Sequence, residues 1–150
     1  MYVTTQFSVF MVNKPGVLAH ILGELAKAKV NIIAMTVMDS VEHGVLRVVL
    51  DNTNLAEQIL GKANFPVNKT EVLCVNLDNK SGALAVVAEK LAVNHINISY
   101  AYCTAGAKGG RTTGILKVAD VKKAMKTLQE NNRASKSQPQ LRRPQANARM

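Results

Sequence analysis

Residues 13–32 read NKPGVLAHILGELAKAKVNI, and residues 79–98 read NKSGALAVVAEKLAVNHINI. The two stretches align over twenty positions without a gap, at an offset of 66 residues, and nine positions are identical. A match of this length within one chain indicates that one structural unit occurs twice. The architecture therefore follows from reading one copy and checking it against the other.

Each copy opens with a strand that leads into a helix. Residues 7–12 and 72–77, just before the repeated stretches, are rich in residues that favour strands. After each Asn-Lys-x-Gly turn, apolar residues recur at the spacing of one helix face. They are Val17, Leu18, Ile21, Leu22 and Leu25 in the first copy and Ala83, Leu84, Val87, Ala88 and Leu91 in the second. Pro15 suits a first helical turn, because its missing N–H has no intrahelical partner to lose.

The rest of each copy predicts a hairpin and a second helix. The hairpin strands are residues 32–38 and 45–50 around a turn at 39–44, and residues 98–103 and 112–118 around the glycine-rich stretch 105–110. The second helices begin near Asn54 and Asp120. The order β-α-β-β-α-β predicts an α+β protein of two ferredoxin-like modules, whose antiparallel sheets join side by side with the helices on one face.

The last strands of the two copies differ. Residues 67–72 supply a last strand for the first copy and run directly into the first strand of the second. The second copy lacks such a segment, because residues 133–150 are polar and basic and hold two of the four prolines, as mobile tails do. We therefore expect a ragged sheet edge there, and divide the chain into module 1 (1–70), module 2 (71–132) and a tail (133–150).

Composition sets the broad class. Hydrophobic residues make up 47% of the chain and charged residues 19%, which is a globular balance. The net charge is +9, but residues 119–150 alone hold eight basic and two acidic residues, so any polyanion affinity belongs to the end of the chain. The chain has neither an apolar run of membrane-spanning length nor a signal-like start. These features predict a cytoplasmic protein with no membrane partner.

Residues suited to catalysis or to metal binding are few. Cys74 and Cys103 lie far apart in apolar, strand-like contexts, so we expect buried, reduced thiols. The three histidines, His20, His43 and His95, are expected at the surface. No phosphate-binding loop, metal-ligand spacing or catalytic triad order occurs. We predict no cofactor, no metal and no enzymatic activity.

The two Asn-Lys-x-Gly turns are the candidate binding sites. Each turn lies between a strand and a helix, so the free N–H groups and the positive dipole end of the helix point at it. Gly16 and Gly82 allow the backbone to come close to a ligand. Asn13 and Asn79 add side chains with both donors and an acceptor. A carboxylate suits such a site, and the occurrence of the turn in both copies strengthens this interpretation.

The pattern resembles the ACT domain, a regulatory module that binds amino acids. In the first copy the resemblance is carried by Asn13, Pro15, Gly16 and Leu18, followed by a helix and then by Val30, Asn31 and Ile32. In the second it is carried by Asn79, Gly82, Leu84, Asn97 and Ile98, with Ser81 in place of the proline. The resemblance covers the chain from about Tyr2 to Asn131. It implies a tandem pair that binds effectors where the strand-to-helix loop of one module faces the other module.

The resemblance also implies which residues bind the ligand. In the serine-sensing ACT domain of phosphoglycerate dehydrogenase, the loop asparagine and the asparagine that opens the second strand hold the effector. They match Asn13 and Asn31, and Asn79 and Asn97, while Met11 and Leu77 stand where that family member has a histidine. The predicted ligand-binding set is Asn13, Lys14, Pro15, Gly16, Val17, Leu18, Asn31, Asn79, Lys80, Ser81, Gly82, Ala83, Leu84 and Asn97, with the first copy favoured as the better site.

The predicted function is regulation by a free amino acid, in a protein that forms a homodimer and acts on other molecules. One alternative is a regulatory subunit that resembles the small subunit of acetolactate synthase and controls a metabolic enzyme in trans. An alternative of another class is an RNA-binding ferredoxin-like protein. Such modules stack bases on strand aromatics, but residues 45–50 and 112–118 contain none, which disfavours nucleic acid as a partner.

Overall fold

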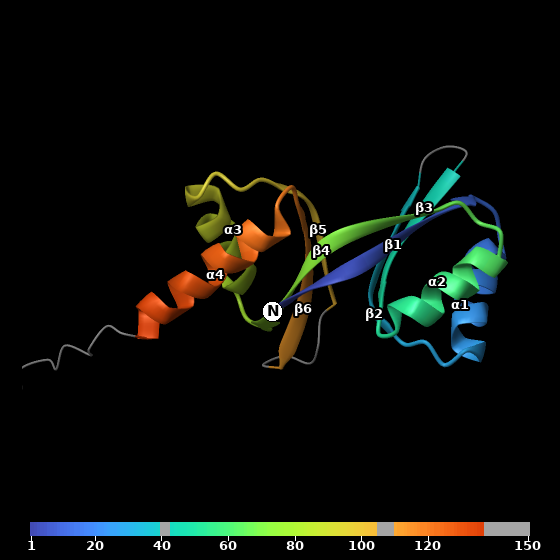
Figure 1. The fold of residues 1–150 in the computed structure, drawn as a ribbon, viewed down its shortest axis with the longest axis horizontal. Coiled ribbons are helices and arrows are strands. Elements are labelled where there is room, and N and C mark those ends of the chain that lie inside the picture. The colour runs from blue at the N-terminus through green and yellow to red at the C-terminus, as the bar shows by residue number, and fades with distance from the viewer. Residues whose placement is uncertain (40–42, 105–109, 137–150) are drawn as a thin grey trace, which may run out of the picture.

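The computed structural model describes residues 1–39, 43–104 and 110–136 (Figure 1), and side chains as far as residue 130. Residues 40–42 of the predicted turn at 39–44 and residues 105–109 of the glycine-rich stretch 105–110 lie outside the described residues. The elements are, in chain order, β1 (Tyr2–Val12), α1 (Val17–Lys27), β2 (Ile32–Asp39), β3 (His43–Leu50), α2 (Thr53–Lys62), β4 (Val67–Asp78), α3 (Ala83–Val93), β5 (Ile98–Thr104), β6 (Arg111–Val118) and α4 (Val121–Lys136).

The six strands form one antiparallel sheet in the order β2-β3-β1-β4-β6-β5. Module 1 contributes β2, β3 and β1 with helices α1 and α2, and module 2 contributes β5, β6 and β4 with helices α3 and α4. The predicted fold, two ferredoxin-like modules with their sheets joined side by side, is confirmed.

The two central strands belong to both modules. β4 is a single strand of 12 residues, whose first part pairs with β1 and whose last part pairs with β6. β1 begins at Tyr2, well before the predicted start, because Tyr2 and Val3 pair with Cys74 and Leu73. The start of β1 thus occupies the position expected for the last strand of module 2. The expectation of a ragged edge there is wrong.

All four helices cover one face of this sheet, as predicted. Alternate residues along β1, among them Val3 and Phe7, point to that face. Phe7 packs with α1 and α2, while Val3 packs against the core under α3 and α4. The sheet bends so strongly that the two helix pairs come to lie on opposite sides of the molecule, with the strands between them (Figure 1).

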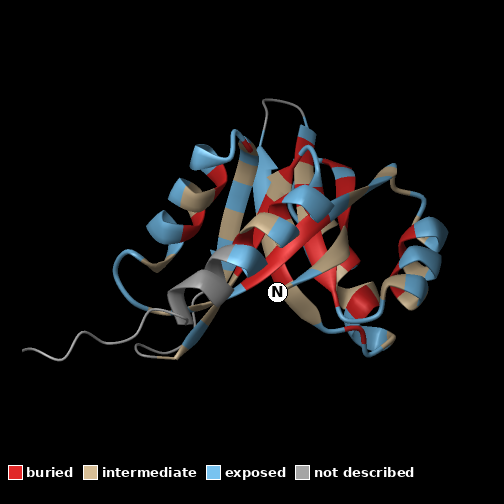
Figure 2. Cartoon of the chain, turned by 60° about the vertical axis from the view of Figure 1, so that its left-hand side comes forward, coloured by how far each residue is buried: buried red, intermediate tan, exposed pale blue. Residues whose placement is uncertain are grey.

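The opposite face of the bent sheet folds onto itself. Small and branched side chains from both modules form a third buried cluster there, which consists of Ala34, Val49, Val72, Cys74 and Ile115. Figure 2 shows buried segments along the central strands of the sheet. Beside this cluster lies Gln6, which is fully buried. Its amide donates a hydrogen bond to the Tyr100 hydroxyl at 2.8 Å and accepts one from the Tyr102 hydroxyl at 2.8 Å. These two bonds tie β1 to β5 across the fold, and burial raises the pKa of Tyr102 well above its usual value.

The second helices begin and end somewhat differently from the predictions. Asn52 caps α2 by accepting a hydrogen bond from the N–H of Leu55, two residues before the predicted start near Asn54. Asp120 caps α4 in the same way, through the N–H of Lys123 at 2.9 Å. Helix α4 continues to Lys136, so the first four residues of the predicted tail, 133–136, are helical.

The expectations for single residues are mostly confirmed. His20, His43 and His95 are exposed, as predicted. Cys74 is buried, but Cys103 is exposed, because it lies near the end of the edge strand β5. Among the described helices, none has the length and apolar character that crossing a membrane requires.

Because β1 fills the edge of module 2, the two ends of the chain should differ in their effect on stability. Removing residues 137–150 should leave cooperative unfolding unchanged. Removing residues 1–4 should lower the free energy of unfolding by about 3 kcal/mol, through the lost burial of Val3 and lost ladder bonds. Denaturant titration of both truncated chains checks this, and a larger loss from the C-terminal truncation would contradict it.

The buried amide of Gln6 offers a second test of the fold. Gln6→Leu should lower the free energy of unfolding by about 1–2 kcal/mol, because it leaves two tyrosine hydroxyls without their partner. In the Tyr102→Phe background the same change should cost less. Equal costs in the two backgrounds, measured by urea denaturation, would show that the hydrogen bond between Tyr102 and Gln6 contributes nothing to stability.

Candidate functional site

The two Asn-Lys-x-Gly loops have the same backbone geometry. In each, the N–H of the residue after the glycine donates to the carbonyl of the lysine, from Val17 to Lys14 at 3.5 Å and from Ala83 to Lys80 at 3.3 Å. Gly16 has φ 88° and Gly82 has φ 83°, values typical of the third residue of a type II turn. Pro15 therefore lies in a turn before α1, and its predicted place inside the first helical turn is wrong.

Each glycine is needed for its backbone conformation and not for space. A Cβ added to Gly16 or Gly82 would meet no atom within 4 Å. A positive φ in this region nonetheless disfavours every residue with a Cβ. The N-cap residues of α1 and α3, Gly16 and Gly82, supply no side-chain cap, and the first N–H group of each helix, from Val17 and Ala83, is used in the turn.

The structure does not bring together the paired asparagines of one module. Asn13 precedes α1 and Asn31 follows it, and the 11 residues of the helix span about 16 Å. The sheet register agrees, since Val12 pairs with His43 at one end of β3 and Ile32 pairs with Leu50 at the other. Asn79 and Asn97 are separated by α3 in the same manner.

The other predicted residues lie mostly at the surface. Exposed residues are Asn13, Lys14, Pro15, Gly16, Asn31, Lys80, Ser81, Gly82, Leu84 and Asn97, whereas Val17, Leu18, Asn79 and Ala83 are partly buried. Leu84 is 40% exposed, so its predicted place on the inward face of α3 is wrong. Asp51 binds the backbone of Asn31 twice. The Asp51 carboxylate accepts a hydrogen bond from the N–H of Asn31 at 3.0 Å, and the N–H of Asp51 donates one to the carbonyl of Asn31.

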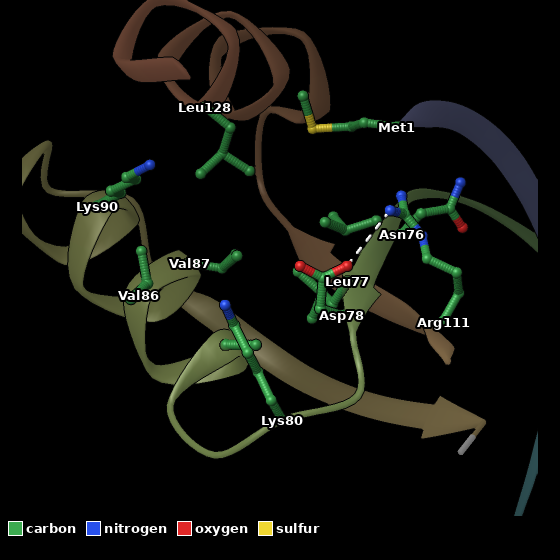
Figure 3. Close-up of a pocket in the computed structure, with 12 residues that line it drawn as sticks. Met1, Asn76, Leu77, Asp78, Lys80, Val86, Val87, Lys90, Arg111 and Leu128 are labelled. Carbon is green, nitrogen blue, oxygen red and sulfur yellow. Dashed lines mark hydrogen bonds and ion pairs between the residues drawn. The ribbon is translucent and has the colours of Figure 1, made fainter. Parts of the chain in front are cut away.

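A cavity of about 570 Å³ lies beside the second loop (Figure 3). It is bounded by the end of β4, the first turns of α3, the start of β6, the inner side of α4 and the N-terminal residue. Its lining comprises Met1, Val75, Asn76, Leu77, Asp78, Lys80, Ala83, Val86, Val87, Lys90, Arg111 and Leu128. Of the predicted site residues, only Lys80 and Ala83 line it.

Charged groups surround the mouth of this cavity. The guanidinium of Arg111 lies 3.4 Å from the carboxylate of Asp78, and the two side chains are 70% and 59% exposed. Lys80 extends toward the same space (Figure 3). Within the described part of the chain, its ammonium group has no hydrogen bond or ion pair. Lys90 adds a third cation from the second half of α3.

The floor of the cavity is aliphatic. Val75 and Val87 are each 7% exposed and Leu128 is 4% exposed. Together with Leu77 and Met1 they form a surface with no aromatic, hydroxyl or thiol group. The arrangement combines a charged rim with an apolar interior, and small-molecule sites commonly have this form.

Sequence reasoning missed most of this lining for identifiable reasons. Asp78 immediately precedes the second loop, so its place near the site could have been predicted from the sequence around the loop. Arg111 reaches the site only through its pairing with Asp78 in the sheet, and the register of two strands more than 30 residues apart is not visible in the sequence. Leu128 reaches it through the packing of α4 on α3.

The loop glycines generate a test of the turn geometry. Gly82→Ala should lower the free energy of unfolding by about 1–2 kcal/mol, because alanine must adopt the positive φ. Gly23→Ala is the matched control, since that glycine lies inside α1 with no atom within 4 Å of an added Cβ. It should raise stability by about 0.5–1 kcal/mol. Thermal or denaturant unfolding measures both, and a destabilised Gly23→Ala would contradict this account.

Residues 1–140 match the family model of the ACT domain pair. Protein BT0572 from Bacteroides thetaiotaomicron has a similar crystal structure, with a TM-score of 0.80 and 28% identity over 87% of this chain and 89% of that chain. The ligand-free regulatory subunit of aspartate kinase from Thermus thermophilus is similar in fold, with a TM-score of 0.61 and 12% identity over 87% and 97% of the two chains. Aspartokinase III from E. coli in complex with lysine and aspartate has a TM-score of 0.53 and 18% identity over 88% of this chain and 32% of that chain. No curated protein matches the chain.

Proposed function

The chain belongs to the ACT domain pair family, and from this premise we propose that it binds a free amino acid and acts as a regulatory protein, not as an enzyme. The observation that supports this most directly is the cavity beside the second loop. It places one carboxylate and three cationic side chains around an aliphatic floor. An amino acid needs these three kinds of contact: a cation for its carboxylate, a carboxylate for its ammonium group, and apolar groups for its side chain.

The cavity is better suited to binding than to catalysis. Among the described residues of its lining, Asp78 supplies the only carboxylate, which already faces Arg111. These residues include no histidine, cysteine, serine, threonine or tyrosine, so they offer no hydroxyl or thiol nucleophile with an adjacent base. These features support a ligand that enters and leaves unchanged.

The loop asparagines remain part of the proposal in a modified form. Since α1 lies between Asn13 and Asn31, one ligand can contact both only if the two residues come from different copies of the chain. The same holds for Asn79 and Asn97. A site of that kind would be shared across a homodimer, in agreement with the predicted oligomeric state.

Regulation requires a second molecule, because ligand binding alone changes no metabolic flux. We propose that a metabolic enzyme, controlled in trans, receives the signal. The regulatory subunit of aspartate kinase from Thermus thermophilus has a similar fold and is an example of a separate regulatory chain. The RNA-binding alternative loses support, because two of the aromatic residues available for stacking, Tyr100 and Tyr102, are held by Gln6 between the two modules.

The proposal predicts stabilisation by at least one of the twenty amino acids. A ligand that binds only the folded state at 100 times its dissociation constant adds about 2.7 kcal/mol to the free energy of unfolding. The melting temperature should therefore rise by several degrees at saturation. Differential scanning fluorimetry followed by calorimetry measures this, and the absence of any shift or heat with all twenty amino acids would refute amino-acid sensing.

A further inference from the structure

The charged residues of this cavity are only partly matched in module 1, although the two modules are repeats. At the repeat offset, Asp78 corresponds to Val12 and Lys90 corresponds to Glu24. By the sheet register, Arg111 corresponds to His43, because Arg111 pairs with Asp78 in module 2 and His43 pairs with Val12 in module 1. The carboxylate, the guanidinium and one of the two ammonium groups are thus absent from module 1. Only Lys14 matches its counterpart, Lys80.

The backbone differs at this position as well. After α2, the chain of module 1 turns back to the sheet, where Pro66 accepts a hydrogen bond from the N–H of Phe10. The ring of Phe65 lies 6.4 Å from that of His20 on α1 and packs against the core of module 1. In module 2 the helix continues to Lys136 instead. No described side chain of module 2 takes the place of Phe65, and Val87 and Leu128 line the cavity beside α3 and α4.

Module 1 has a hollow of about 510 Å³, but elsewhere. It lies between α1 and α2 and is lined by His20, Glu24, Lys27, Ala28, Ile59, Lys62 and Ala63. No residue of the Asn-Lys-x-Gly loop and no strand residue borders it. It thus differs from the cavity of module 2 in both position and chemistry.

Burial separates the charged from the apolar part of the cavity in module 2. Lys80, Asp78 and Arg111 are exposed, whereas Val75, Val87 and Leu128 are buried. A ligand whose charged head lies at the rim keeps its charges paired and partly hydrated. A second carboxylate on the ligand side chain would have to lose water among aliphatic groups, which costs several kcal/mol. The floor thus selects an aliphatic side chain, despite the excess of cations at the rim.

We propose that each chain binds one aliphatic α-amino acid, in the cavity of module 2. Its carboxylate pairs with Lys80, its ammonium group pairs with Asp78, and its side chain packs on Val87 and Leu128. Module 1 holds no equivalent ligand. This assignment rests on the proposed amino-acid binding and names the site and the ligand class.

Calorimetry with L-leucine as the probe tests the assignment on the full chain. The expected stoichiometry is one leucine per chain. Lys80→Gln and Asp78→Asn should each weaken binding about tenfold or more, as for a charged ligand group left unpaired. Lys122→Gln, which changes an exposed lysine of α4 outside the cavity lining, is the control and should leave the affinity unchanged. All three residues are exposed, and melting curves of the variants verify that they fold.

Two further ligands separate the contributions of the head group and the side chain. 4-Methylpentanoate, which lacks the ammonium group, should bind at least tenfold more weakly than leucine, and L-glutamate should bind more weakly than leucine. Equal affinity of 4-methylpentanoate would overturn the role of Asp78, and tighter binding of glutamate would overturn the aliphatic assignment. If leucine binds but Lys80→Gln and Asp78→Asn bind it as tightly as the unmodified chain, the cavity is not the site, although amino-acid sensing stands. If none of the twenty amino acids binds, the proposed function itself fails.

Discussion

The antiparallel pairing of β1 with β4 is the constraint on which the rest of the structure depends. It runs from Tyr2 opposite Cys74 to Val9 opposite Val67 and joins the two modules along the centre of one sheet. Each strand is long because it serves both modules: β1 pairs with β3 beyond this segment, and β4 pairs with β6. Neither module can complete its sheet without a strand that also belongs to the other. The pair therefore forms one folding unit, although its sequence reads as two.

Strand alternation along this shared pair explains how the molecule has three cores. Odd-numbered residues of β1 supply both helix-covered cores, with Val3 under α3 and α4 and Phe7 under α1 and α2. Even-numbered residues face the third cluster, where Gln6 lies. A buried amide costs free energy unless its donors and acceptor are paired. The two tyrosine hydroxyls of β5 and the hydroxyl of Ser8 satisfy this requirement, and the tyrosines connect β5 to β1 across the fold.

The repeat made the fold predictable, because hydrophobic periodicity and turn residues are local signals. These signals predicted the order of the strands and helices. They also predicted which helix residues face the core, such as Ile21, Leu25, Val87 and Leu91, which are buried. The errors concern partners distant in sequence. The edge of module 2 was expected to be ragged because its last strand was sought after α4, whereas the chain supplies it from Tyr2 onward. The site was predicted in part for the same reason: the loop is local, but its cavity is completed by Arg111 and Leu128 through sheet register and helix packing.

The two copies have kept the turn that orients the helix and diverged in what surrounds it. Gly16 and Gly82 keep the same positive φ, so the turn is a structural requirement of both copies and does not by itself mark a binding site. The difference lies in the neighbouring positions, since Val12 and His43 of module 1 stand where module 2 has Asp78 and Arg111. Met1 lines that cavity, and β1 continues from it through Gln6 into the core of module 1. The cavity also borders β4, the other strand that both modules share, through Val75 and Leu77.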